Sequence, residues 1–118
     1  MFSTAQCNLS NSEQKDYETF CYEISEISKK LIESHKQSSK SNCFSLHSSD
    51  HQNFNNCLKD RLTTIEINSK SFSSKLAFES LSYDQCLRKD PIFITPQICL
   101  KDMETRCFKH LKDFQNIY

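Results

Sequence analysis

Glycine is absent from this 118-residue chain, and proline occurs only twice, at Pro91 and Pro96. Tight β-hairpins and glycine-rich phosphate-binding loops both need residues that tolerate a positive φ. Asn-Gly and Asp-Gly turns are missing as well. These absences argue against an all-β domain and against a nucleotide-binding α/β domain. They predict an all-α chain in which helices are joined by long loops.

An excess of either sign of charge is also lacking, because 15 basic residues balance 15 acidic ones. The sequence therefore offers no electrostatic basis for binding nucleic acid or an anionic membrane surface. Only 36% of the residues are apolar, and the apolar runs are short, so we expect a small core and no transmembrane span. The first twenty residues contain no apolar stretch typical of a secretory signal peptide.

Cysteine is the residue that the chain has in excess, with seven copies at positions 7, 21, 43, 57, 86, 99 and 107. No two of them form a Cys-x-x-Cys pair, which argues against a zinc knuckle and against a thioredoxin-type redox motif. Wide and irregular spacing is typical of long-range disulfides in an oxidising compartment. Because the number is odd, at least one thiol lacks an internal partner and suggests a bond to another chain.

The spacing of apolar residues predicts a first helix over about residues 12–36. Tyr17 and Phe20 begin a stripe that continues in steps of three and four, as one face of a helix requires. Ser10 and Glu13 match a capping box at its start. We expect this helix to bury its stripe against another helix.

A serine-rich segment over about residues 37–94 has weak periodicity, with short amphipathic pieces only near Leu58–Ile67 and Ser74–Leu81. It predicts a long loop that is either partly disordered or pinned by disulfides and a partner, and the three cysteines within it favour pinning. A second helix is predicted over about residues 96–118, because Thr95 is a good N-cap and Pro96 suits the first helical position. The whole chain, 1–118, is interpreted as one domain and as the front half of a helical bundle.

No catalytic constellation and no cofactor motif is predicted, and the chain is not expected to be an enzyme. Cys107 and His110 share a helix face, but a pair without an orienting group is weak evidence for a nucleophile. Four residues in the serine-rich segment are a minor candidate for a zinc site: Cys43, His47, His51 and Cys57. Disulfide cysteines beside exposed histidines are the favoured interpretation, so no metal is expected. Asn8 begins an N-glycosylation sequon, which is relevant only to a secreted chain.

Three patches of the sequence form a recognisable series. The first contains Cys86-Leu87, Phe93-Ile94-Thr95 and Cys99-Leu100, the second combines Cys57-Leu58 with Leu62-Thr63, and the third combines Leu111-Lys112 with Phe114-Gln115. These stretches resemble the interleukin-12 alpha-subunit family, which belongs to the interleukin-6-type long-chain helical cytokines and has the elements of the first patch in the same order. The resemblance implies a four-helix-bundle cytokine of which this chain holds the first helix, the long crossover loop and the second helix.

The resemblance also implies roles for the cysteines. Cys21 would pair with Cys99, and Cys57 would pair with Cys107. Cys86 matches the cysteine that bonds to the receptor-like beta subunit of the family.

Two cysteines remain unpaired within the chain in this scheme. Cys43 matches a cysteine whose partner lies on the last helix of the family, and Cys7 has no counterpart.

The leading hypothesis is a secreted, extracellular cytokine subunit that pairs covalently with a beta subunit and engages a cell-surface cytokine receptor in immune signalling. One alternative is a stand-alone, interferon-like helical cytokine. Another is an intracellular, largely disordered interaction protein with reduced cysteines, which the missing leader and the serine-rich centre favour. A thiol count on the purified protein separates the last of these from the first two.

Overall fold

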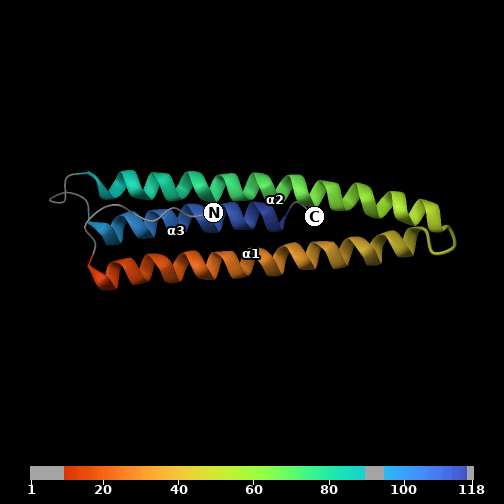
Figure 1. Ribbon diagram of the computed structural model, residues 1–118, viewed down its shortest axis with the longest axis horizontal. Coiled ribbons are helices and arrows are strands. Elements are labelled where there is room, and N and C mark those ends of the chain that lie inside the picture. Colours follow the sequence, from red (N-terminus) through yellow and green to blue (C-terminus); the bar gives the residue numbers. More distant parts are fainter. Residues whose placement is uncertain (1–9, 90–94, 117–118) are drawn as a thin grey trace.

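The computed structural model describes residues 10–89 and 95–116, which form three α-helices and no strand. Helix α1 spans Asn11–Leu46, α2 spans His51–Leu87 and α3 spans Pro96–Gln115. They lie side by side in a rod of 66 × 19 × 19 Å. Helix α2 runs antiparallel to α1, and α3 runs back in the direction of α1 (Figure 1). The predicted all-α class is confirmed.

Helix α1 begins as the sequence predicts. The Ser10 hydroxyl accepts a hydrogen bond from the Glu13 amide at 3.2 Å, and the Ser10 amide donates to the Glu13 carboxylate at 3.4 Å. This reciprocal pair satisfies two amides that the first helical turn leaves without partners.

The end of α1 differs from the prediction, because the helix continues ten residues beyond position 36, to Leu46. In this stretch, the helix face that points to the core has polar or small side chains instead of large apolar ones. The buried residues beyond Ile24 are Ser28, His35, Ser39 and Cys43. Successive members are seven, four and four residues apart, so they share one helix face that points to the core. Because most of them are polar or small, the spacing of apolar residues in the sequence does not reveal this part of the helix.

A four-residue turn, residues 47–50, joins α1 to α2 without glycine. The His47 amide donates to the Cys43 carbonyl, and the Asp50 carboxylate accepts from the amides of Gln52 and Asn53 at 3.2 Å each. Within residues 10–89 and 95–116, no residue has a positive φ. The turn therefore closes α1 with a backbone hydrogen bond and begins α2 with a side-chain cap, without the left-handed residue that commonly ends a helix.

Helix α2 occupies most of the segment that was predicted to be a loop, and that prediction is wrong. Its buried apolar residues Ile65, Phe72, Leu76 and Tyr83 follow one another in steps of seven, four and seven. Serines alternate with them, but no proline or glycine interrupts the segment. Because nothing breaks the backbone, even a sparse apolar stripe supports a 37-residue helix once it packs on α1 and α3.

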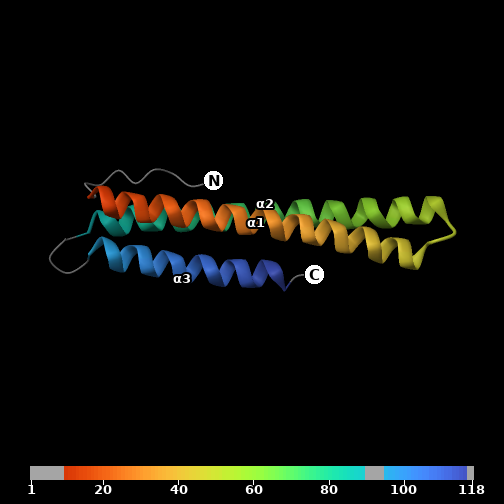
Figure 2. The same cartoon turned by 90° about the horizontal axis from the view of Figure 1, so that it is seen from below.

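Helix α3 starts at the predicted cap, where the Thr95 hydroxyl accepts from the Ile98 amide at 3.3 Å. It is much shorter than the other two helices and accompanies only part of the α1–α2 hairpin (Figure 2). The rod therefore has a three-helix half and a two-helix half.

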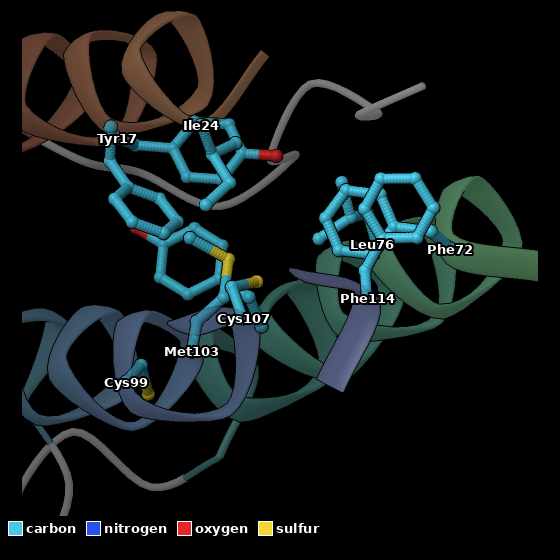
Figure 3. Close-up of a cluster of buried hydrophobic side chains, with 10 residues drawn as sticks. Tyr17, Ile24, Phe72, Leu76, Cys99, Met103, Cys107 and Phe114 are labelled. Carbon is cyan, nitrogen blue, oxygen red and sulfur yellow. The ribbon is translucent and has the colours of Figure 1, made fainter. Parts of the chain in front are cut away.

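The core fills the three-helix half. Tyr17 and Ile24 of α1 point toward Met103 and Cys107 of α3, and Phe114 lies beside residues of α2 (Figure 3). Stacked rings tie α2 to its neighbours. The Tyr17 and Tyr83 centroids are 4.7 Å apart, and those of Phe72 and Phe114 are 4.9 Å apart.

Candidate functional site

Two disulfides connect consecutive helices at opposite ends of the rod. Cys43 near the end of α1 bonds to Cys57 near the start of α2, with a Cα–Cα distance of 5.7 Å. Cys86 at the end of α2 bonds to Cys99 at the start of α3, with a Cα–Cα distance of 5.8 Å. Both distances fit normal disulfide geometry.

This connectivity corrects the two internal pairs that the resemblance implied, Cys21 with Cys99 and Cys57 with Cys107. The physical reason is the presence of α2. A flexible loop can carry Cys57 to α3, but helix α2 holds it beside Cys43 near the α1–α2 turn. Helix α3 does not extend to that end of the rod (Figure 1). The same helix α2 brings Cys86 to the start of α3, where it bonds to Cys99.

Two further assignments are corrected by the same bonds. Cys86 was expected to link the chain to a beta subunit, but its sulfur is bonded to Cys99. Cys43 was expected to remain unpaired, but it is bonded to Cys57. Cys7 and the sequon residue Asn8 lie outside the described residues, so their roles stay predictions.

The remaining described cysteines, Cys21 on α1 and Cys107 on α3, are free thiols. Cys107 is wholly buried, and Cys21 is partly buried against the same core. Burial raises the pKa of Cys21 to about 11 and that of Cys107 to about 12. Both are therefore neutral thiols at pH 7.

Next to Cys107 lies the only buried acidic side chain of the described ranges, Glu79 of α2, which is 3% exposed. Its carboxylate pairs with the Arg106 guanidinium, and the His110 imidazole lies 3.4 Å from its other oxygen. Together with burial, the carboxylate also raises the pKa of Cys107. The sequence suggested Cys107 and His110, but Glu79 was missed, because a lone glutamate in serine-rich sequence gives no signal of burial.

Cys107, His110 and Glu79 have the composition of a thiol nucleophile, a base and an orienting acid. Their geometry does not serve that chemistry. Cys107 has no exposed surface, and Glu79 opposes formation of its thiolate, whereas a catalytic cysteine needs a lowered pKa and access to substrate. We interpret the cluster as a structural ion pair that fixes α3 on α2.

The four candidate zinc residues lie at one end of the rod, but the two cysteine sulfurs among them are joined in a disulfide and are therefore not available as thiolate ligands. Cys43 and Cys57 bond to each other, while His47 and His51 flank the turn. Within residues 10–89 and 95–116, no group of three or more histidine, cysteine or acidic side chains is placed to hold a metal ion.

Several cavities lie along α1. One, of 660 Å³, is an open depression lined only by α1 side chains that lie between Gln37 and Leu46. A second, of 400 Å³, lies between α1 and α2 and is lined by His35, Asp60 and Arg61 among others. A third, of 270 Å³, lies between α1 and α3 and includes Ile27, Leu31 and Leu111. None combines enclosure with a converging set of polar groups, as small-molecule sites do.

Large apolar side chains are exposed on one face of α2. Ile67, Phe78 and Leu81 are 62%, 65% and 57% exposed. Phe78 follows Ile67 by about three helical turns, and Leu81 follows Phe78 by one. These three residues are called the α2 stripe below.

No helix within the described part of the chain has the length and apolar character needed to cross a membrane. Comparison with family models, with curated proteins and with solved structures gives no match to this chain.

Proposed function

We propose that this protein is a secreted helical ligand of the cytokine type, which acts outside the cell by binding receptor-like proteins and not by catalysis. The observation that supports this most directly is the pair of disulfides, each joining the end of one helix to the start of the next. Such bonds persist in oxidising compartments and are rare in the reducing cytosol. A chain with a sparse core gains more from them than a well-packed domain does.

The proposal concerns a helical bundle in general and no particular cytokine topology. Helices α1 and α2 are antiparallel and joined by a four-residue turn (Figure 1), whereas long-chain cytokine bundles connect two parallel helices by a long crossover. The crossover loop that the interleukin-12 alpha resemblance implied is therefore not part of the proposal.

The mode of partner binding is proposed to be non-covalent. Cys86, the expected link to a beta subunit, is occupied by Cys99. Of the two free thiols that the structure describes, Cys107 is wholly buried, and Cys21 is half-buried against the core, where a small molecule reaches it more easily than the cysteine of a second chain does. This favours the stand-alone, interferon-like alternative over a covalent heterodimer.

The α2 stripe is the surface we assign to the receptor-like partner. Aromatic side chains such as Phe78 are enriched in protein interfaces, and the neighbouring Ile67 and Leu81 extend the apolar surface around it. The stripe lies on α2, the longest of the three described helices.

The test begins with protein secreted from eukaryotic cells, whose free thiols are counted under denaturing conditions. We expect Cys43, Cys57, Cys86 and Cys99 to resist alkylation until a reductant is added. Full reactivity of all four in protein from its native source would support the intracellular alternative and overturn the proposal.

Binding is then measured on cells of the source organism with labelled protein. Phe78→Ser combined with Leu81→Ser should weaken saturable binding at least tenfold, since two hot-spot side chains are lost. Lys59→Ser, at an exposed position on the same helix and about 28 Å of helix rise from Phe78, is the matched control and should bind as the parent does. Equal binding by all three proteins would remove the α2 stripe from the proposal.

A further inference from the structure

Helices α1 and α3 are the one pair in the described rod that no disulfide connects. Cys43–Cys57 joins α1 to α2, and Cys86–Cys99 joins α2 to α3. The two free thiols, Cys21 and Cys107, lie on the helices of the unconnected pair. This distribution prompts the question whether they can meet.

The register of the two helices places the thiols at nearly the same level. The rings of Phe20 on α1 and Phe108 on α3 pack edge to face, with their centroids 5.7 Å apart. The helices run in the same direction (Figure 1). Cys21 follows Phe20 directly and Cys107 directly precedes Phe108, so the two cysteines are offset by about 3 Å of helix rise, which is less than one turn.

Their side chains also face the same core. Cys21 lies four residues after Tyr17 and three before Ile24, two buried residues on the inner face of α1, and it packs against the cluster that contains Cys107. The Cys21 thiol contributes electrostatically to the raised pKa of Cys107, as expected of close neighbours.

We propose that Cys21 and Cys107 form a redox modification site that takes a small-molecule disulfide, such as oxidised glutathione, and becomes a third crosslink between α1 and α3. The inference does not depend on the proposed function.

The exchange proceeds in two balanced steps. The Cys21 thiolate attacks one sulfur of the small disulfide, which releases one thiol and leaves a mixed disulfide on Cys21. The Cys107 thiolate then attacks the Cys21 sulfur and expels the second small thiol. The small disulfide gains two electrons, and the two protons lost by the protein are carried by the released thiols.

Cys21 is assigned the first step because it is partly exposed, whereas Cys107 is wholly buried. The second step needs no access from solvent, since both sulfurs lie within the protein. Because only the thiolate reacts, the rate should rise about tenfold per pH unit between pH 7 and pH 9.

The test uses the intact, folded wild-type protein and peptide mapping. The protein is incubated with oxidised glutathione, alkylated and digested with trypsin without reduction. Cleavage after lysine and arginine places Cys21 in fragment 16–29, Cys107 in fragment 107–109, and Cys7 in fragment 1–15. The expected product is fragment 16–29 joined to fragment 107–109.

The existing disulfides provide the internal control, because they lie in other fragments. Cys43 and Cys57 share fragment 41–59, and Cys86 joins fragment 76–88 to fragment 90–101. These products should be unchanged by the treatment.

A variant pair separates the two steps. Cys107→Ser should stop at a stable glutathione adduct on Cys21, whereas Cys21→Ser should leave Cys107 unmodified in the folded state. Three results would overturn the proposal: persistent glutathione on Cys21 in the wild type, a bond from Cys21 to Cys7, or alkylation of both thiols after prolonged oxidation.

Discussion

At the scale of single residues, the described molecule depends on polar groups placed inside a narrow rod. The Tyr17 hydroxyl and the Ser80 hydroxyl form a buried hydrogen bond of 3.0 Å between α1 and α2. Glu79 and Arg106 make the corresponding connection between α2 and α3. Polar interactions of this kind fix the alignment of helices, because a shift along the axis leaves a buried group without its partner.

The first prediction concerns that ion pair. Arg106→Ala removes the main partner of the buried Glu79 carboxylate, so the free energy of unfolding should fall by about 2–3 kcal/mol. Urea denaturation followed by circular dichroism measures the change. Lys109→Ala, an exposed position on the same helix, is the control and should cost less than about 0.5 kcal/mol. Equal losses in the two variants would contradict the role given to Glu79.

The second prediction concerns His35, which is buried. The Phe114 ring packs against the His35 imidazole in an edge-to-face arrangement, with the two ring centroids 5.5 Å apart. Burial lowers the pKa of His35 below its usual 6.5, although a hydrogen bond with the Phe114 backbone opposes the shift. The unfolded chain therefore binds more protons, and stability that is present above pH 6.5 is lost as the pH falls. The slope contributed by this group is at most about 1.4 kcal/mol per pH unit.

The measurement compares urea denaturation of the wild type and of His35→Gln between pH 7.5 and pH 5. The variant should show the flatter dependence on pH. His51→Gln, at an exposed position, should keep the wild-type dependence. A His35→Gln profile parallel to that of the wild type would contradict the argument.

At the scale of elements, sequence periodicity predicted the starts of α1 and α3 but missed α2. Caps are local, so Ser10 with Glu13, and Thr95 with Pro96, could be recognised from a few residues. Helix α2 could not be recognised in this way, because its core face mixes apolar residues with serine and glutamate. Packing against two neighbours decides its structure, and that information is not local.

The disulfide pattern could not be predicted for the same reason. Cysteine positions permit many connectivities, and only the course of the chain between them selects one. Once α2 is a straight helix, Cys57 lies beside Cys43 and Cys86 lies beside Cys99. The buried thiols were predicted as disulfide partners, although a free thiol in the core behaves as a small apolar side chain.

The third prediction tests how much each half of the rod depends on its crosslink. Each disulfide closes a loop of similar length, with sequence separations of 14 and 13, and should stabilise by about 3 kcal/mol. Loss of one bond should affect a different region from loss of the other, because α3 packs along only one half of the α1–α2 hairpin. Cys43→Ser with Cys57→Ser should accelerate amide hydrogen exchange near the α1–α2 turn and leave α3 protected.

The matched variant, Cys86→Ser with Cys99→Ser, should instead expose α3 to exchange while the α1–α2 turn stays protected. Hydrogen exchange read by mass spectrometry distinguishes the two patterns. Uniform acceleration over all three helices in both variants would show that the rod unfolds as one unit.

At the scale of the whole molecule, the shape is the most distinctive property. The radius of gyration is 18.7 Å, whereas a typical domain of this length has about 13–14 Å. A rod exposes a large surface for its mass, which explains why so few residues are fully buried and why crosslinks contribute so much to its stability.

The fourth prediction follows from that shape. Small-angle X-ray scattering of the monomer should give a radius of gyration near 19 Å and a maximum dimension near the 66 Å length of the rod. Addition of a reductant should increase the radius, because the two-helix half then loses its only covalent connection beyond the turn. A radius close to that of a sphere would contradict the extended arrangement of α1 and α2.

The placement of the two bonds at opposite ends has a consequence for survival among proteases. Each bond spans one of the two connections between helices, residues 47–50 and residues 88–95. A cut in either connection would separate the backbone into two fragments that sulfur still holds in register. The nicked protein would migrate as one species until reduced, whereas a hairpin without the bond would separate into two pieces at the same cut.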